Sequence, residues 1–194
     1  MKKISLDDLP NNESYAAQRP AIRQAMMEHK AKRRIQLGPN ATLHFEDYMT
    51  MRYQVQELLR AEKITSVADI REELEAYNPL IPDGKNLKVT FMLEYPDENE
   101  RRQQLAKLIG IENSIAIAIG EHEPVYPIAN EDLERSTDEK TSSVHFLRFE
   151  FSDQAIASAK QGAAWKITSE HENYQHHTGA LPESVRQSLV NDFD

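Results

Sequence analysis

Hydrophobic and polar residues follow one period before about residue 80 and another period after it. In the first part, apolar residues recur at three- and four-residue steps, as they do along one face of a helix. In the second part, apolar and polar residues alternate, as they do in half-buried strands. We therefore predict an α+β fold, in which a helical N-terminal region over residues 1–80 packs on a mostly antiparallel sheet with helices over residues 85–194. The two regions are expected to form one compact unit.

Three helices and one short turn are expected in the N-terminal region. A long helix is predicted from Pro20, which suits a first turn, through the apolar Ile35 to a stop at Gly38 and Pro39. Residues 42–45 are expected to be extended. Residues of the type that caps a first turn precede the other predicted helical segments, at Ser5, Asp47 and Ser66.

Turn signals divide the second region into short strands and helices. One helical turn is expected in the polar segment 131–141, and the sequence EHENYQHH at 170–177 is expected to be a surface loop. Strands are predicted at 87–95, 113–119, 125–128, 143–151 and 165–169, and helices at 98–109, 153–161 and 182–190.

The predicted strand at 143–151 carries large apolar residues on both faces, so both faces are expected to be at least partly covered. His145 then lies on one face and Arg148 on the other. A buried arginine requires a carboxylate partner, because burying an unpaired charge is very costly. Its expected partner is an acidic residue such as Glu57, Glu62 or Glu131. The pattern fits either a structural ion pair or a polar pocket between the helical region and the sheet.

The predicted helix after Asp47 carries a polar stripe, because Arg52, Gln56 and Arg60 are spaced four residues apart with Glu57 beside them. Guanidinium groups at this spacing fit an anion or carboxylate site. The alternative is a solvated helix face with intrahelical ion pairs, each worth only a few tenths of a kcal/mol.

The segment just before residue 143 is rich in charged and hydroxyl side chains, including Arg135 and Lys140. Loops that a rigid strand holds in place often bind ligands, although many are simply solvated. Combining this loop with the strand and the helix, we predict one polar pocket between the helices and the sheet. Its candidate ligand-binding residues are Arg52, Glu57, Arg60, Arg135, Lys140, His145 and Arg148.

No metal site and no cofactor are predicted. The chain has no cysteine, which excludes thiolate catalysis and cysteine-ligated metal centres within it. The common phosphate-binding glycine motifs and the nucleophile-elbow motif are also missing. Histidines and carboxylates in EHENYQHH suit a metal, but their spacing matches no compact ligand motif.

The net charge of −9 is distributed unevenly over the 194 residues. Residues 1–37 contain eight Lys or Arg and four Asp or Glu, a net charge of +4, so the remaining residues carry −13. An acidic body argues against nucleic-acid binding, and the basic run that includes Arg33 is interpreted as a helix end. No segment is apolar enough to span a membrane, and no signal peptide is visible, so we expect a cytoplasmic protein.

Three segments resemble the bacterial domain-of-unknown-function family 3501: FEDYMTMRYQVQELLRAEKI at 45–64, EELEAYNPLIPDG at 72–84 and LERSTDEKTSSVHFLRFEF at 133–151. The resemblance extends over nearly the whole chain. It implies no established activity and no catalytic residues. It implies an accessory role in redox or peroxide defence, beside rubrerythrin-like or iron–sulfur proteins.

Three functional hypotheses follow. The first is an accessory or binding protein that holds an unknown protein or a small anionic ligand in the polar pocket. The second is an enzyme of undescribed type, either a hydrolase or a non-thiol metalloenzyme, that uses His145 and nearby carboxylates. The third is a purely structural subunit.

Overall fold

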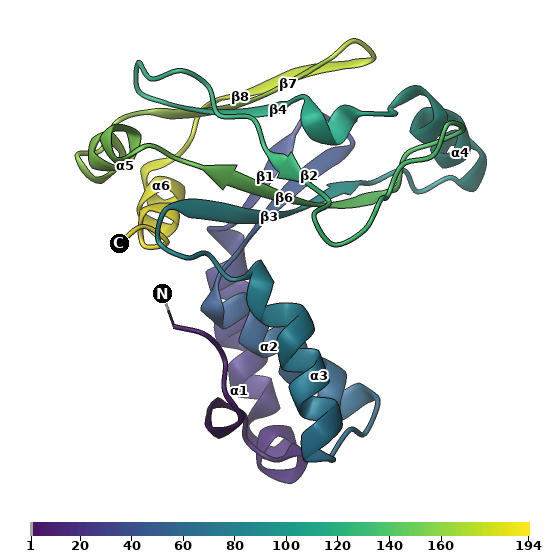
Figure 1. Cartoon of the computed structure of the whole chain (residues 1–194), viewed down its shortest axis with the longest axis vertical. Coiled ribbons are helices and arrows are strands. Elements are labelled where there is room, and N and C mark those ends of the chain that lie inside the picture. Colours follow the sequence, from purple (N-terminus) through teal and green to yellow (C-terminus); the bar gives the residue numbers. More distant parts are fainter. Residues whose placement is uncertain (1) are drawn as a thin grey trace.

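The computed structural model of the chain describes residues 2–194. A helical arm, made of α1 to α3 with η1 and η2, extends from a head that contains all the strands (Figure 1). All strand pairs in the head are antiparallel, which confirms the predicted α+β fold. The helical elements are η1 (Leu6–Asp8), α1 (Asn12–Ala31), α2 (Tyr48–Ala61), α3 (Val67–Tyr77), η2 (Asn78–Leu80), α4 (Glu98–Lys107), η3 (Ile111–Asn113), α5 (Asp153–Lys160) and α6 (Glu183–Val190).

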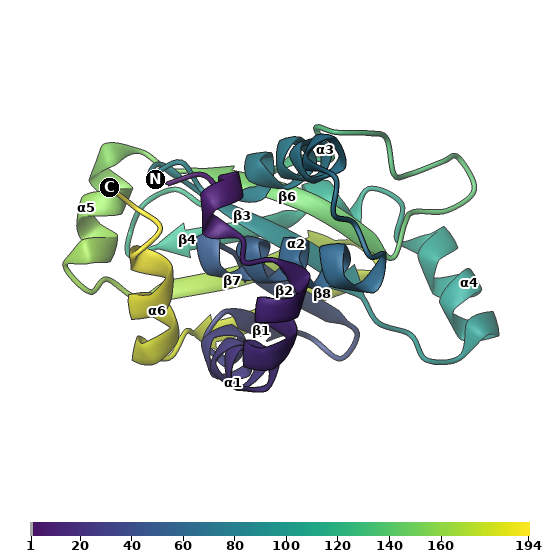
Figure 2. The ribbon, with the colours of Figure 1, turned by 90° about the horizontal axis from the view of Figure 1, so that it is seen from below.

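The strands form two sheets, and the larger one lies between the smaller one and the helical arm (Figure 1). The five-stranded sheet has the order β1-β2-β3-β6-β5, and the three-stranded sheet has the order β4-β7-β8. Helices α4 and α5 lie at opposite ends of the head (Figure 2). The strands are β1 (Arg34–Leu37), β2 (Ala41–Glu46), β3 (Asn86–Leu93), β4 (Ile115–Ile119), β5 (Ile128–Ala129), β6 (Val144–Glu150), β7 (Trp165–His171) and β8 (Tyr174–Ala180).

The main core lies between the two sheets and follows from the alternation in the sequence. Residues such as Phe91 on β3 and Phe149 on β6 are fully buried there, together with Ile117 and Ile167 from the smaller sheet. Their neighbours along each strand point the other way and are mostly half-buried. The five-stranded sheet therefore has one apolar inner face and one mixed outer face on the side of the arm.

The helical arm has a small core of its own, formed by Ile4, Met51, Val55, Leu59, Leu74 and Ile81. Its predicted caps are present, since Asp47 accepts a hydrogen bond from the Thr50 amide and Ser66 accepts one from Asp69. Ser5 directly precedes η1. Among residues 2–194, no helix is both long enough and apolar enough to cross a membrane.

Several predicted elements were wrong. The first helix begins at Asn12 and ends at Ala31, with Pro20 inside it, and Ile35 belongs to β1 rather than to a helix. The hairpin of β1 and β2 thus joins the sheet although it lies within the region predicted to be helical. The histidine-rich segment is not a loop, because it forms the β7–β8 hairpin. Residues 131–141 contain no helical turn. The division of the chain near residues 80–85 stays a prediction.

Candidate functional site

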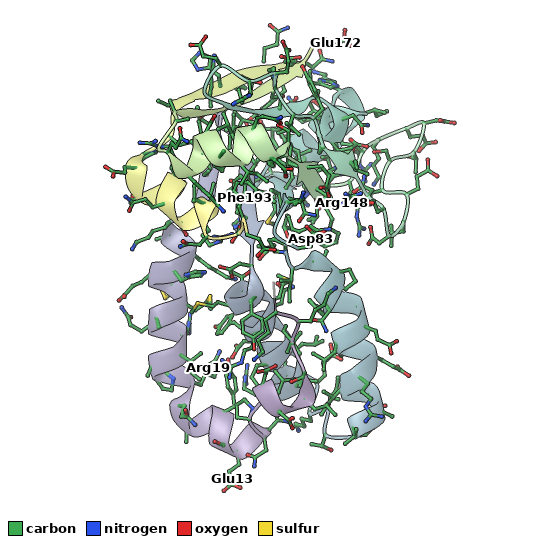
Figure 3. The ribbon with its side chains drawn as sticks, turned by 60° about the vertical axis from the view of Figure 1, so that its left-hand side comes forward. Glu13, Arg19, Asp83, Arg148, Glu172 and Phe193 are labelled. Carbon is green, nitrogen blue, oxygen red and sulfur yellow. The ribbon has the colours of Figure 1, made fainter. Side chains whose placement is uncertain are left out.

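A cavity of about 280 Å³ lies where the helical arm meets the outer face of the five-stranded sheet. Arg148 lies close to this junction, in the same part of the molecule as Asp83 (Figure 3). We call this cavity the Arg148 pocket. It is lined by Glu46, Pro79, Leu80, Lys88, Val89, Glu131, Asp132, Phe146, Leu147 and Arg148.

The register of three strands places a row of charged side chains in the floor of the pocket. Glu46 on β2 pairs with Lys88 on β3, and Lys88 pairs with Arg148 on β6. Directly paired residues project from the same face of a sheet, so the three side chains are neighbours. The Thr90 hydroxyl donates a hydrogen bond of 2.8 Å to Glu46 Oε1 and fixes that end of the row.

Arg148 is held by two carboxylates. Its Nε and Nη2 donate to the two oxygens of Glu131 at 2.7 Å each, and its Nη1 contacts Glu150. The pair with Glu131 raises the pKa of Arg148 and lowers the pKa of Glu131. Glu131 was one of the three partners predicted for this arginine. Three of its five N–H donors are used by these carboxylates, which also balance its charge, so Arg148 is less available to a ligand than an unpaired cation.

Lys88 differs from its neighbours because its ammonium group makes no hydrogen bond or ion pair within residues 2–194. The side chain is half-buried, and burial together with the nearby Arg148 guanidinium lowers the pKa of Lys88. Apolar side chains, including Leu80 and Phe146, line the same cavity. Lys88 is therefore a cation with unused donors in a partly apolar pocket.

Three of the predicted residues lie on α2 and do not line this pocket. Glu57 accepts a hydrogen bond of 2.7 Å from the Tyr15 hydroxyl and two of 2.8 Å from Arg19. The Arg19 fork is the main reason that the pKa of Glu57 falls to about 2. Arg60 lies 3.7 Å from Glu57, and Arg52 Nε donates to the Asp8 carbonyl. The predicted stripe therefore faces α1 and the N-terminal segment and ties them to α2.

His145 lies on the inner face of β6, opposite to Arg148, and is fully buried. Asn130 Nδ2 lies 3.0 Å from its Nδ1, and the Ser142 carbonyl lies 3.0 Å from its Nε2. An amide nitrogen only donates and a carbonyl only accepts, so the ring is neutral with its proton on Nε2. Burial lowers the pKa of His145, which agrees with the neutral form. Thr141 Oγ1 also lies 3.0 Å from Nε2.

The carboxylate nearest to His145 is Glu112, with Oε2 4.0 Å from Nε2. The ring has no exposed surface and all its polar contacts are to the protein. A substrate could reach it only after residues 130–142 moved away. The geometry gives His145 the role of anchoring this loop to the sheet.

The two remaining predicted residues lie in that loop. The Arg135 guanidinium stacks 4.6 Å from the centre of the Phe146 ring and pairs with Asp132, so it contacts two residues that line the Arg148 pocket. Lys140 is exposed and does not line the pocket. The prediction that all seven side chains converge was wrong, because the helix stripe, the inner sheet face and the outer sheet face point to different places.

A second charged cluster, which the sequence analysis missed, closes the joint between arm and head. Arg33 is buried, pairs with Asp192, and lies 3.4 Å from Asp47. His29 Nε2 lies 2.6 Å from the same Asp47 carboxylate. Burial raises the pKa of Asp192 to about 7, although Arg33 opposes this shift. Arg33 was interpreted as part of a basic helix end, and its partner at position 192 lies 159 residues away.

Within residues 2–194, no group of three or more histidine, aspartate or glutamate side chains is arranged to hold a metal ion. In the histidine-rich hairpin, the His176 ring packs on the Tyr174 ring with 4.4 Å between ring centres. Alternation along β8 separates neighbouring histidines onto opposite faces.

A family model described as "Protein of unknown function (DUF3501)" matches residues 3–193. The fold is also similar to a crystal structure of a novel protein of unknown function from Burkholderia pseudomallei K96243. The two chains are 43% identical, each is covered over 100% of its length, and the TM-score is 0.94. No curated protein matches the chain. The match over almost every residue shows that this chain belongs to the DUF3501 family.

Proposed function

We propose that the protein is an accessory binding protein whose Arg148 pocket takes a small monocarboxylate with an apolar body. The observation that carries this proposal is the half-buried Lys88 ammonium, which has no partner among residues 2–194. A carboxylate bound there would restore the charge balance that burial disturbs. Charge-assisted hydrogen bonds of this kind are among the stronger polar contacts in proteins.

The charges around Lys88 favour a single negative charge on the ligand. Two cations and three carboxylates line the pocket, and one of those cations, Arg148, is already paired. A phosphate or a dicarboxylate would bring its second charge close to Glu46 or Glu131. Phe146 and Leu80 offer apolar surface to the rest of the ligand. A cavity of about 280 Å³ suits one ring or a short chain.

We also propose that the protein acts in the cytoplasm beside a rubrerythrin-like or iron–sulfur protein. The family resemblance supports this partner. The proposal assigns no redox step to the residues of this chain.

The binding proposal is tested by titrating the full chain with benzoate and with the matched neutral amide, benzamide, in a calorimeter. We expect benzoate to bind more tightly. Lys88→Met should weaken benzoate binding roughly 10- to 100-fold, which corresponds to the loss of one charged hydrogen bond of about 1.5–3 kcal/mol. Equal binding of the acid and the amide, no binding of the acid, or full binding by Lys88→Met would each refute the proposal.

Lys85→Met is the matched control. Lys85 is exposed directly before the same strand, and its ammonium is paired with Asp153 at 2.8 Å. This variant removes the same charge from the chain without touching the pocket. We expect it to bind benzoate as the wild type does.

A further inference from the structure

We propose a second binding site on the helical arm, for a small neutral molecule whose planar edge carries an N–H and a C=O side by side. The site is a groove of about 210 Å³ between α1 and α2, which we call the Gln56 groove. Its lining is Pro10, Tyr15, Ile22, Ala25, Met26, Met49, Arg52, Tyr53 and Gln56.

Gln56 is the polar feature that identifies the site. It is 2% exposed, and both its Nε2 and its Oε1 are buried without a hydrogen-bond partner within residues 2–194. A buried amide that makes no hydrogen bond costs about 1–3 kcal/mol. Helix α2 bears that cost at a position that faces a largely apolar groove. Neither polar atom has accessible surface, so a ligand in the groove pairs with the carboxamide once the side chains over it move aside.

The two unpaired atoms determine the chemistry of the ligand. A carboxamide presents one donor and one acceptor in a single plane, so its complement is an acceptor and a donor at the same spacing. Lactams, primary amides and nucleobase edges have this arrangement, and glutamine pairs with the adenine edge in this way. A carboxylate has no donor and would leave Oε1 of Gln56 unpaired. The site thus selects a different ligand class from the Arg148 pocket.

The walls of the groove determine the size and shape of the ligand. Ile22 and Ala25 contribute apolar surface from α1, and Met26 and Met49 add flexible thioether side chains that adapt to a ring. The volume lies below the usual range of drug-sized pockets, which limits the ligand to one ring.

No residue lines both the Gln56 groove and the Arg148 pocket. The two sites lie on different elements, one between two helices of the arm and the other on the outer sheet face. Binding at either site can therefore be tested without the other, and failure of one proposal leaves the other standing.

The test compares 2-pyridone, which carries the N–H and C=O edge, with N-methyl-2-pyridone, which lacks the donor. Ligand-detected NMR titrations with the full chain give both dissociation constants. We expect 2-pyridone to bind at least tenfold more tightly, because only it can satisfy both atoms of Gln56. If both compounds bind equally, or neither binds, Gln56 does not pair with a ligand in the groove and the proposal is wrong.

Gln56→Met is the decisive variant, because methionine has a similar volume and no polar head. We expect the tenfold preference for 2-pyridone to disappear, and the melting temperature to stay the same or rise. Gln54→Met is its control, since Gln54 is exposed two residues earlier on α2 and should keep the preference. If Gln56→Met does not fold, Gln56→Leu replaces it and should also lose the preference, because leucine has neither donor nor acceptor. A variant of Gln56 that keeps the preference would overturn the assignment.

Discussion

Arg33 and Arg148 each face two carboxylates, but they do so in different surroundings. The Arg33 side chain is 2% exposed, and its ion pairs join the end of α1, the start of α2 and the segment that follows α6. The Arg148 side chain is 22% exposed and its partners, Glu131 and Glu150, are more exposed still. One arginine and two carboxylates therefore interact in a buried, low-dielectric site around Arg33. The equivalent three groups around Arg148 interact close to water.

This difference in burial distinguishes charged residues that stabilise the fold from charged residues that can bind a ligand. An ion pair in a low dielectric is strongly coupled, and removing one partner leaves an uncompensated buried charge. A half-exposed pair is screened by water and contributes little to stability, so its members can change partners when a ligand arrives. The buried cluster of Arg33, Asp47 and Asp192 should hold the arm to the head. The row of Glu46, Lys88 and Arg148 instead forms the floor of a pocket.

The largest expected effect is that of Arg33→Met. The substitution removes the cation beside Asp192 and leaves Asp47 with only His29 next to it. At pH 8, where Asp192 is ionised, the free energy of unfolding should therefore fall by about 3–5 kcal/mol. Urea denaturation followed by circular dichroism measures this loss. Arg34→Met is the control on the next residue, where the exposed guanidinium lies 3.6 Å from Glu94. It should cost less than about 1 kcal/mol. Similar losses of stability in the two variants would contradict the proposed difference between a buried and an exposed arginine ion pair.

The second effect concerns pH and Asp192. Burial raises its pKa from 3.8 to about 7, so the folded state holds a proton that the unfolded chain has already released. The stability that this proton provides is present below about pH 4 and is lost as the pH rises to about 7. Its full size is about 4 kcal/mol.

Asp192→Asn keeps the shape of the side chain and removes the titration. The stability of the wild type relative to this variant should therefore fall between pH 4 and pH 8. Urea denaturation at intervals of one pH unit measures the difference. A difference that stays constant over this range would mean that Arg33 holds Asp192 ionised throughout.

The sequence was informative where one face of a strand is buried. Alternation located β3 and β6, because every second residue enters the core and its neighbours do not. It missed β8, because that strand buries only Tyr174 and so lacks an apolar alternation. It placed Ile35 on a helix because one apolar residue fits a three- or four-residue step as well as a two-residue step.

The candidate site was less predictable for a related reason. Glu131 was among the expected partners of Arg148, since it lies in the adjoining loop and needs only local folding to reach the strand. Lys88 enters the pocket because β3 pairs with β6 in the register that places it opposite Arg148. Arg33 is held by a carboxylate that lies 159 residues away in the sequence. Local patterns carry no information about either pairing. The stripe on α2 was recognised, but whether it faces the sheet or another helix is decided by the tertiary packing.

A third effect concerns His145, which extends the comparison to an uncharged buried cluster. His145→Leu would leave Asn130 and the Ser142 carbonyl without their partners, so the unfolding free energy should fall by about 1–3 kcal/mol. Amide hydrogen exchange should accelerate over residues 130–142, because the loop loses its anchor. His44→Leu is the control on the outer face of the same sheet, where Nε2 is buried without a hydrogen-bond partner among the residues described. His44→Leu should leave the hydrogen-exchange rates of the loop amides unchanged. If exchange over residues 130–142 stays slow in His145→Leu as well, the anchoring role is wrong.

The smallest expected effect is that of Arg148→Met, which tests whether the exposed row is coupled to Lys88. Loss of the half-exposed pair should lower the unfolding free energy by about 1 kcal/mol or less. The same change removes a cation that lowers the pKa of Lys88, and it frees the carboxylates of Glu131 and Glu150. The pKa of Lys88 should therefore rise toward its ordinary value. Titration of ¹³C-methylated lysines by NMR measures it, with Lys85 as the internal reference because it pairs with Asp153. A Lys88 pKa that does not move, or a stability loss as large as that of Arg33→Met, would show that the two arginines do not differ in the way proposed.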